Sequence, residues 1–283
     1  MYTRPTAPLP IGGVIDDAIK LYRGSFRGCW VLSLIGSIIV GATAIYRASQ
    51  LRGVGTLGNL ARTADTAQHI AEALRQFSAN FRGPGFLSQL LIYAVQLLIY
   101  LALFAQVNSV AQQRSGQSPV DAVAAGLRRL PGAIVAVIVF AVGVGIGFFL
   151  LFIPGFYLWG KLEFWLSAVF ADDVGAIEGL GRSWVATSGN WWRSVTIVSV
   201  ALIIILVLEI LATVVTGSAV GIMLGVYHSS LEAVLIATQI VSAILSVFVL
   251  PMIPAVMLST YYDLKLRREG GDLAARATSL QTA

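Results

Sequence analysis

The chain has 283 residues, of which 57% are hydrophobic and only 12% are charged, with a net charge of +5. An average soluble domain is about 25% charged and 45–50% apolar, so the composition excludes an ordinary soluble domain and predicts membrane embedding. A single cysteine, Cys29, excludes an internal disulfide and a multi-cysteine metal site. The placement of the positive charges is more informative than their sum, and no nucleic-acid partner is expected.

Residues 1–27 are predicted to form a cytoplasmic N-terminus with an interfacial helix. Acidic residues come early in this segment and arginines come late, which suits the two ends of a helix. Aromatic residues follow directly before the first apolar run, at the depth where they anchor a helix in the membrane interface. Segments 118–137 and 175–195 have a similar pattern. The pattern predicts one interfacial helix and two spans, used three times; the alternative is that any cytoplasmic entry to a span looks like this.

Six apolar segments are predicted to cross the membrane, because about 20 apolar residues in a helix span roughly 30 Å of hydrocarbon. The predicted spans are 28–46, 86–110, 131–153, 156–171, 194–216 and 233–260. Pro154 and Gly155 join the third span to the short fourth in a tight hairpin, and Pro251 and Pro254 predict a kink in the sixth. The expected fold is all-α: a polytopic integral membrane protein with a six-span domain at 28–262.

The lysines and arginines predict the orientation, since cytoplasmic loops carry the excess of positive charge. With the N-terminus inside, thirteen of these residues lie inside and five lie outside, all five in the outer loop 47–85. We therefore expect both termini on the cytoplasmic side, with 263–283 as a basic tail suited to anionic lipid. Within the outer loop, small and apolar residues between Leu57 and Leu74 predict a helix that includes His69.

Charged residues occur inside the predicted spans. Lys161 and Glu163 stand two residues apart, so they do not face each other on a helix, and each needs another partner. At 1.5 Å per residue, Lys161 and Glu209 lie about 8 and 10 Å below the outer surface, which predicts an ion pair between them. The full predicted polar layer comprises Gln96, Lys161, Glu163, Glu209 and Gln239. Such a layer either locks the helices together or forms a path for a proton, an ion or a lipid headgroup.

A second group of candidate residues lies on the cytoplasmic side, before the fifth span. This cytoplasmic collar is basic and aromatic and comprises Arg182, Ser183, Trp184, Asn190, Trp191, Trp192 and Arg193. Such residues anchor a protein at headgroup depth, or they provide a docking site for a partner. Gly143 and Gly147 form a GxxxG pattern, which favours close approach of another helix.

Signatures of enzymes are absent from the sequence: it has no GxSxG, HExxH, Walker or CxxC motif. Both histidines, His69 and His228, fall in predicted outer loops. We therefore expect a protein that is not an enzyme, with no cofactor and no metal site.

Several stretches resemble a known family. PGFYLWGKLEFWLSAVF (154–170), EGLGRSWVATSGNWW (178–192), YYDLKLRREGGDL (261–273) and the opening PLPIGGVIDDAIKLYRGSFRGCW are similar to the glycerophosphoryl diester phosphodiesterase membrane-domain family and its YciC-like relatives. The resemblance implies a bacterial six-span fold in the inner membrane. In some members the membrane domain is fused to a soluble phosphodiesterase barrel of about 250 residues, for which these residues leave no room. The resemblance thus implies a fold and a location, without an activity.

The predicted function is that of a non-catalytic, multi-pass inner-membrane scaffold or subunit that acts through protein or lipid partners. The alternative is a small transporter or channel that uses Lys161, Glu163 and Glu209. Expected partners are membrane lipids and either another membrane protein or further copies of this chain.

Overall fold

The computed structural model describes residues 2–50, 84–114, 117–227 and 231–281. These residues form helices and connecting turns, with no strand among them, so the predicted all-α class is confirmed. The helices are α1 (Ile11–Gln50), α4 (Pro84–Ala111), α5 (Pro119–Leu150), α6 (Phe152–Leu162), α7 (Trp165–Ala171), α8 (Ala176–Thr187), α9 (Trp191–Tyr227), α10 (Leu231–Val249) and α11 (Met252–Gln281). Both histidines and the helix predicted between Leu57 and Leu74 lie outside the described residues.

Local sequence signals explain several helix ends. Ser118 caps α5, because its hydroxyl accepts a hydrogen bond from the Asp121 amide while the Asp121 carboxylate accepts one from the Ser118 amide. Pro119 takes the first helical position, where its missing amide hydrogen costs nothing. Pro251 separates α10 from α11, so the helix is interrupted where a kink was predicted in the sixth apolar segment.

Five helical segments in the described part of the chain are long and apolar enough to cross a membrane. They are Ile11–Thr43, Phe86–Ala111, Pro119–Leu150, Trp191–Ala219 and Ala237–Gly270. The first runs without interruption from the predicted interfacial helix into the predicted span, so the expected boundary between them at residue 28 does not interrupt the helix.

The predicted fourth span, 156–171, is wrong as a single helix. Its helix α6 ends at Leu162, and α7 begins at Trp165 after two residues that turn the chain. With 11 residues, α6 is about 17 Å long, roughly half the hydrocarbon thickness. All six of the residues from Trp165 to Phe170 in α7 are buried within the protein, where no lipid can reach them.

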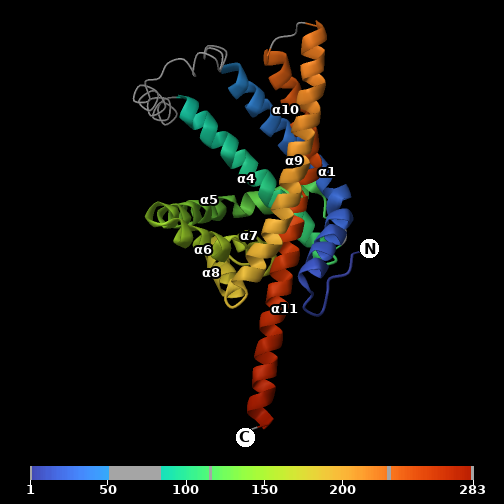
Figure 1. Cartoon of the computed structure of the whole chain (residues 1–283). Helices are drawn as coiled ribbons and strands as arrows, with labels where there is room; N and C mark the ends of the chain where they lie inside the picture. Colours follow the sequence, from blue (N-terminus) through green and yellow to red (C-terminus); the bar gives the residue numbers. More distant parts are fainter. Residues whose placement is uncertain (1, 51–83, 115–116, 228–230, 282–283) are drawn as a thin grey trace.

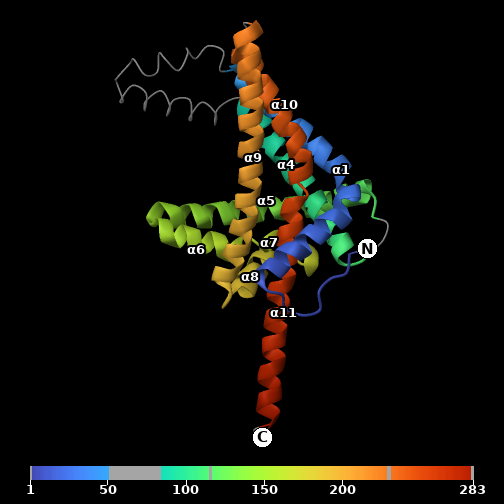
Figure 2. The same cartoon turned by 45° about the vertical axis from the view of Figure 1, so that its right-hand side comes forward.

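The helices meet in a common region, which we call the base, where α7, α8, the start of α9 and α11 pack together next to α4 (Figure 1). From this base α9 and α10 rise side by side, and the second half of α1 and α4 rise on the same side. Both views show α5 and α6 lying across the long axis of α9 and α11, with α8 next to them, while α11 extends in the opposite direction (Figure 2). The core surrounds the buried stretch of α4 from Leu101 to Val107, which packs against α1, α5, α7 and α11.

The α5–α6 hairpin depends on two glycines at its crossing. An added Cβ at Gly147 would lie 2.8 Å from the Cα of Gly155, and one at Gly155 would lie 2.5 Å from the amide nitrogen of Phe148. The close approach predicted from the GxxxG pattern therefore occurs at Gly147, whereas an added Cβ at Gly143 would meet no atom within 4 Å. At the hairpin tip, Phe149 is 90% exposed and Ile153 80% exposed. This tip is a large apolar surface that requires lipid or another protein to cover it.

Candidate functional site

The base of the molecule holds a network of buried charges centred on α11. Asp263 is 4% exposed and accepts hydrogen bonds from the Leu9 amide at 2.8 Å, from Arg193 of α9 at 3.0 and 3.2 Å, and from Arg267 at 3.0 Å. Both arginines also donate to the carbonyl of Leu9. One carboxylate thus joins the N-terminal segment, α9 and α11, which are far apart in the sequence.

A second carboxylate, Asp172, lies at the end of α7. It accepts a hydrogen bond from the Tyr261 hydroxyl at 2.7 Å and from Lys265 at 2.7 Å, both on α11, and Arg182 of α8 lies 3.6 Å away. The adjacent Asp173 pairs with Arg129 of α5. Because each acid meets cations from other helices, the charges at the base are largely neutralised within the protein.

Asn108 of α4 connects this base to the core. Its side-chain amide donates to the carbonyl of Phe170 at 2.7 Å, and its oxygen accepts a hydrogen bond from the Tyr262 hydroxyl at 2.8 Å. The sequence did not single out Asn108, Asp172 or Asp263 as site residues. The available signal was their sequence context: polar residues next to long apolar runs, in AQVNSVAQQ, VFADD and YYDLKLRR.

The predicted ion pair between Lys161 and Glu209 is not formed. Lys161 is 4% exposed, its ammonium donates to the Ser188 hydroxyl at 3.1 Å, and it lies over the rings of Trp184 and Tyr157 at 5.3 and 5.6 Å. These contacts hold it beside the start of α9, whereas Glu209 lies about 27 Å further along the same helix. The depth argument failed because it assumed that 156–171 is one continuous helix, whereas α6 ends at Leu162.

The rest of the predicted polar layer is also dispersed. Gln96 is half-buried on α4, Glu209 is half-buried on α9, and Gln239 is on α10, where it lines the groove between α10 and α1. The carboxylate oxygens of Glu163, at the end of α6, are buried and have no hydrogen-bond partner in the described part of the protein. Burial raises the pKa of this carboxyl to about 9, so Glu163 is neutral at pH 7. Lys161 and Glu163 are therefore accommodated separately in the apolar stretch. Lys161 contacts aromatic rings and a hydroxyl, whereas Glu163 is buried in its protonated form.

The predicted cytoplasmic collar divides into an inner and an outer part. Ser183 is buried, donates to the carbonyl of Lys161 at 2.8 Å and accepts from the amide of Phe164 at 3.1 Å, so it holds the turn between α6 and α7. Arg193 faces inward to Asp263, and the Trp191 indole donates to the carbonyl of Tyr157.

The outer part of the collar remains at the surface. Arg182 pairs with Glu178 on the exposed face of α8, and this hydrogen bond raises the pKa of the guanidinium. Trp184 is partly exposed where it covers Lys161, Asn190 precedes α9, and Trp192 is 76% exposed. This part of the collar includes its most exposed side chains, which lipid or a partner protein can contact.

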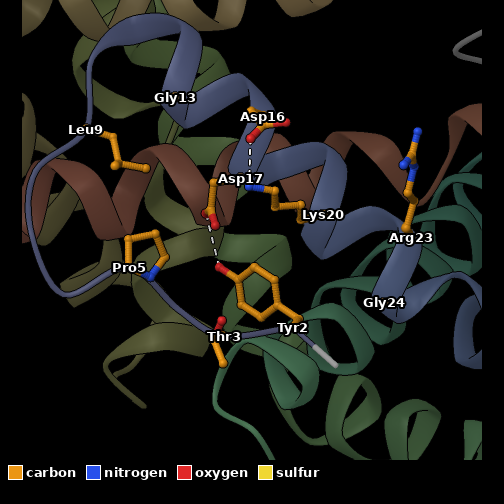
Figure 3. A pocket seen from close by; sticks show the side chains of 10 residues that line it. All are labelled: Tyr2, Thr3, Pro5, Leu9, Gly13, Asp16, Asp17, Lys20, Arg23 and Gly24. Carbon is orange, nitrogen blue, oxygen red and sulfur yellow. Dashed lines mark hydrogen bonds and ion pairs between the residues drawn. The ribbon is translucent and has the colours of Figure 1, made fainter.

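A polar cleft of about 570 Å³ lies between the N-terminal segment and the first turns of α1 (Figure 3). Tyr2 reaches across it and donates to the buried carboxylate of Asp17 at 3.0 Å. Burial, together with the negative charge of Asp17, raises the pKa of the Tyr2 hydroxyl. Asp16 and Lys20 pair along the wall of the cleft at 2.7 Å, and Arg23 extends from α1 one turn further on.

Neither charge network has the composition of a metal centre. Within the described ranges, no group of three or more histidine, cysteine, aspartate or glutamate side chains could hold a metal ion. Asp172 and Asp263 instead meet lysine, arginine and tyrosine donors, which is the composition of an ion-pair network that joins helices.

Comparison with known proteins identifies a family for the chain. No curated protein and no solved structure matches the chain, so the resemblance to the glycerophosphoryl diester phosphodiesterase membrane-domain family stays a prediction. A model of a domain family of unknown function matches residues 31–263, which include the second half of α1, the apolar helices that follow and both acidic centres, Asp172 and Asp263. Since this match covers most of the chain, the protein belongs to that family, the domain of unknown function DUF7847.

Proposed function

We propose that the protein is a non-catalytic, multi-pass scaffold of the bacterial inner membrane that holds a partner protein and lipids at its cytoplasmic base. The observation that carries this proposal is the separation of the molecule into two parts. The charged residues of the base are neutralised by one another across five segments of the chain, whereas the rising helices and the hairpin expose apolar side chains. A base held together by ion pairs and attached to helices with apolar surfaces is suited to holding a partner protein at the membrane.

The dispersal of the polar layer favours the scaffold over a transporter. A transport path through the apolar helices needs polar groups that face one another across the bundle. Lys161 is enclosed by Ser188, Trp184 and Tyr157, and Glu209 is distant from it along α9. Neither residue lines the polar cleft of about 570 Å³, which is formed by the N-terminal segment and α1.

For the topology, we propose four crossings, by α1, α4, α9 and the α10–α11 segment, with both termini in the cytoplasm. The α5–α6 hairpin would lie along the cytoplasmic leaflet, with its tip in lipid. Three observations support this arrangement: α6 is too short to cross, Lys161 near its end contacts the turn before α9, and α5 packs beside the amphipathic helix α8. Four crossings give the same excess of positive charge on the cytoplasmic side as six crossings, because the hairpin turn that changes sides carries no lysine or arginine.

Native mass spectrometry of the protein extracted gently from its own membranes tests the scaffold function. We expect a second protein in a fixed ratio, and we expect Trp192→Ala to reduce its retention about tenfold, because exposed tryptophans are frequent anchors of interfaces. Tyr93→Ala is the matched control, since Tyr93 is also an exposed aromatic residue but lies on α4, outside the collar. Retention of no second protein under conditions that keep the chain folded would contradict the scaffold function.

A further inference from the structure

One face of α1 extends from the polar cleft beside the N-terminal segment to an apolar groove between α1 and α10. At 100° per residue, Asp16, Lys20, Arg23, Arg27, Leu34, Ile38 and Gly41 fall within about one sixth of the helix circumference. The charged members stand at the cytoplasmic end of this face, and Trp30 lies at the boundary with the apolar members. We call this surface the α1 face. Such a change from charged to aromatic to apolar along one face matches the profile of a lipid leaflet.

The polar hollow is the cleft beside the N-terminal segment. Its ionisable wall on α1 comprises two acids and two bases, Asp16, Asp17, Lys20 and Arg23, so its formal charge is balanced. Asp17 is already bonded to Tyr2 and Ser259. Asp16 and Lys20 are more than half exposed although they pair with each other, and Arg23 is exposed at the end of the cleft that is nearer the membrane (Figure 3).

The apolar hollow is a groove of about 530 Å³ between α1 and α10. Small residues open it: Ser37, Gly41 and Ala42 on α1, and Ala243 on α10. Leu34 and Ile38 form one wall, and Phe248, which stacks on Phe26 of α1 at 5.7 Å, closes the end toward the base. A narrow groove with this lining suits a flexible hydrocarbon chain.

The spacing of the two hollows suits a single molecule. From Arg23 to Leu34 the helix rises about 16 Å, and from Trp30 to Ala42 it rises about 18 Å. One leaflet has about 15 Å of hydrocarbon, half of the bilayer core. An acyl chain that begins at Trp30 therefore ends near Ala42, with its headgroup beside Arg23 and Arg27.

From this geometry, and building on the lipid partner in the proposed function, we propose that the α1 face binds one phospholipid of the cytoplasmic leaflet with a zwitterionic, amine-bearing headgroup. Arg23 and Lys20 hold the phosphate, Asp16 meets the ammonium group, and an acyl chain fills the α1–α10 groove. The balanced charge of the cleft selects the class, because an anionic headgroup without an amine leaves Asp16 facing the phosphate and gains nothing from the acid.

The test measures lipid retained by the full chain after reconstitution in vesicles of equal parts phosphatidylethanolamine and phosphatidylglycerol and gentle extraction. We expect about one phosphatidylethanolamine per chain. Arg23→Ala should reduce this retention about tenfold by removing a charge-assisted bond to phosphate, and Ala42→Phe should reduce it similarly by filling the exposed groove. Arg114→Ala and Ala141→Phe are the matched controls, because both residues are exposed and line neither hollow.

The outcomes separate this site from the scaffold function. Loss of phosphatidylethanolamine in Arg23→Ala and Ala42→Phe, with normal retention in both controls, establishes the site. Equal retention in all variants, or preference for phosphatidylglycerol, overturns it. A stoichiometric partner protein with no retained phosphatidylethanolamine also overturns it and leaves the scaffold function standing.

Discussion

Asp263→Asn should lower the free energy of unfolding by about 3 kcal/mol, because it removes the negative charge between two largely buried arginines. The asparagine has nearly the same shape, so the loss reflects charge and hydrogen bonding rather than packing. Arg193 and Arg267 would retain only the Leu9 carbonyl and a neutral amide oxygen as acceptors. We expect a lower midpoint of thermal unfolding in detergent and faster hydrogen exchange in residues 2–9, which Asp263 attaches to α11.

Asp173→Asn is the matched control for this experiment. Asp173 also pairs with an arginine, Arg129, but its side chain is mostly exposed, and an exposed ion pair contributes about 0–1 kcal/mol. Its backbone has φ +54°, a conformation that asparagine tolerates well. If the two substitutions had equal effects on the unfolding midpoint, Asp263 would not be the centre of the base.

Gly155→Ala should destabilise the protein by about 3 kcal/mol, because the new methyl group has no space at the hairpin crossing. Its Cβ would lie 2.5 Å from the nitrogen and 2.7 Å from the Cα of Phe148, and backbone atoms inside a helix cannot yield as a flexible side chain does. Separation of α5 from α6 would also disturb Lys161 and its contacts. The expected readouts are a lower unfolding midpoint and a smaller yield of monodisperse protein.

Gly145→Ala provides a control of opposite sign. An added Cβ at Gly145 meets no atom within 4 Å, and alanine in a helix is more stable than glycine by about 0.5–1 kcal/mol. This variant should therefore raise the unfolding midpoint slightly. A Gly155→Ala protein as stable as Gly145→Ala would mean that the two legs of the hairpin do not cross at this point.

Much of the fold could be predicted from local patterns. Apolar runs give long helices, so α1, α4, α5 and α9 follow from the sequence, as do the start of α5 at Ser118 and the break at Pro251. The fourth predicted span failed because hydrophobicity alone does not distinguish lipid from protein. The stretch from Trp165 to Phe170 is apolar because it is buried among other helices.

The candidate site was much less predictable. Hydrogen bonds of the base join residues as far apart as Leu9 and Asp263, and no local pattern encodes such a pairing. Lys161 was found as a buried cation, but its partners are aromatic rings and a hydroxyl rather than an acid. Opposite charge and equal depth favoured Glu209 as the partner, but Lys161 lies over the ring of Trp184, which is 23 positions further along the chain.

The most direct test of the proposed membrane arrangement is cysteine labelling with a membrane-impermeant maleimide, in a Cys29→Ala background. Three single variants report the base, the far end of α9 and the hairpin tip: Glu178→Cys, Ser218→Cys and Ile153→Cys. In intact cells we expect labelling of Ser218→Cys alone, with Glu178→Cys labelled after permeabilisation and Ile153→Cys only in detergent. Labelling of Glu178→Cys in intact cells would contradict a cytoplasmic base, and labelling of Ile153→Cys from outside would mean that the hairpin crosses the membrane.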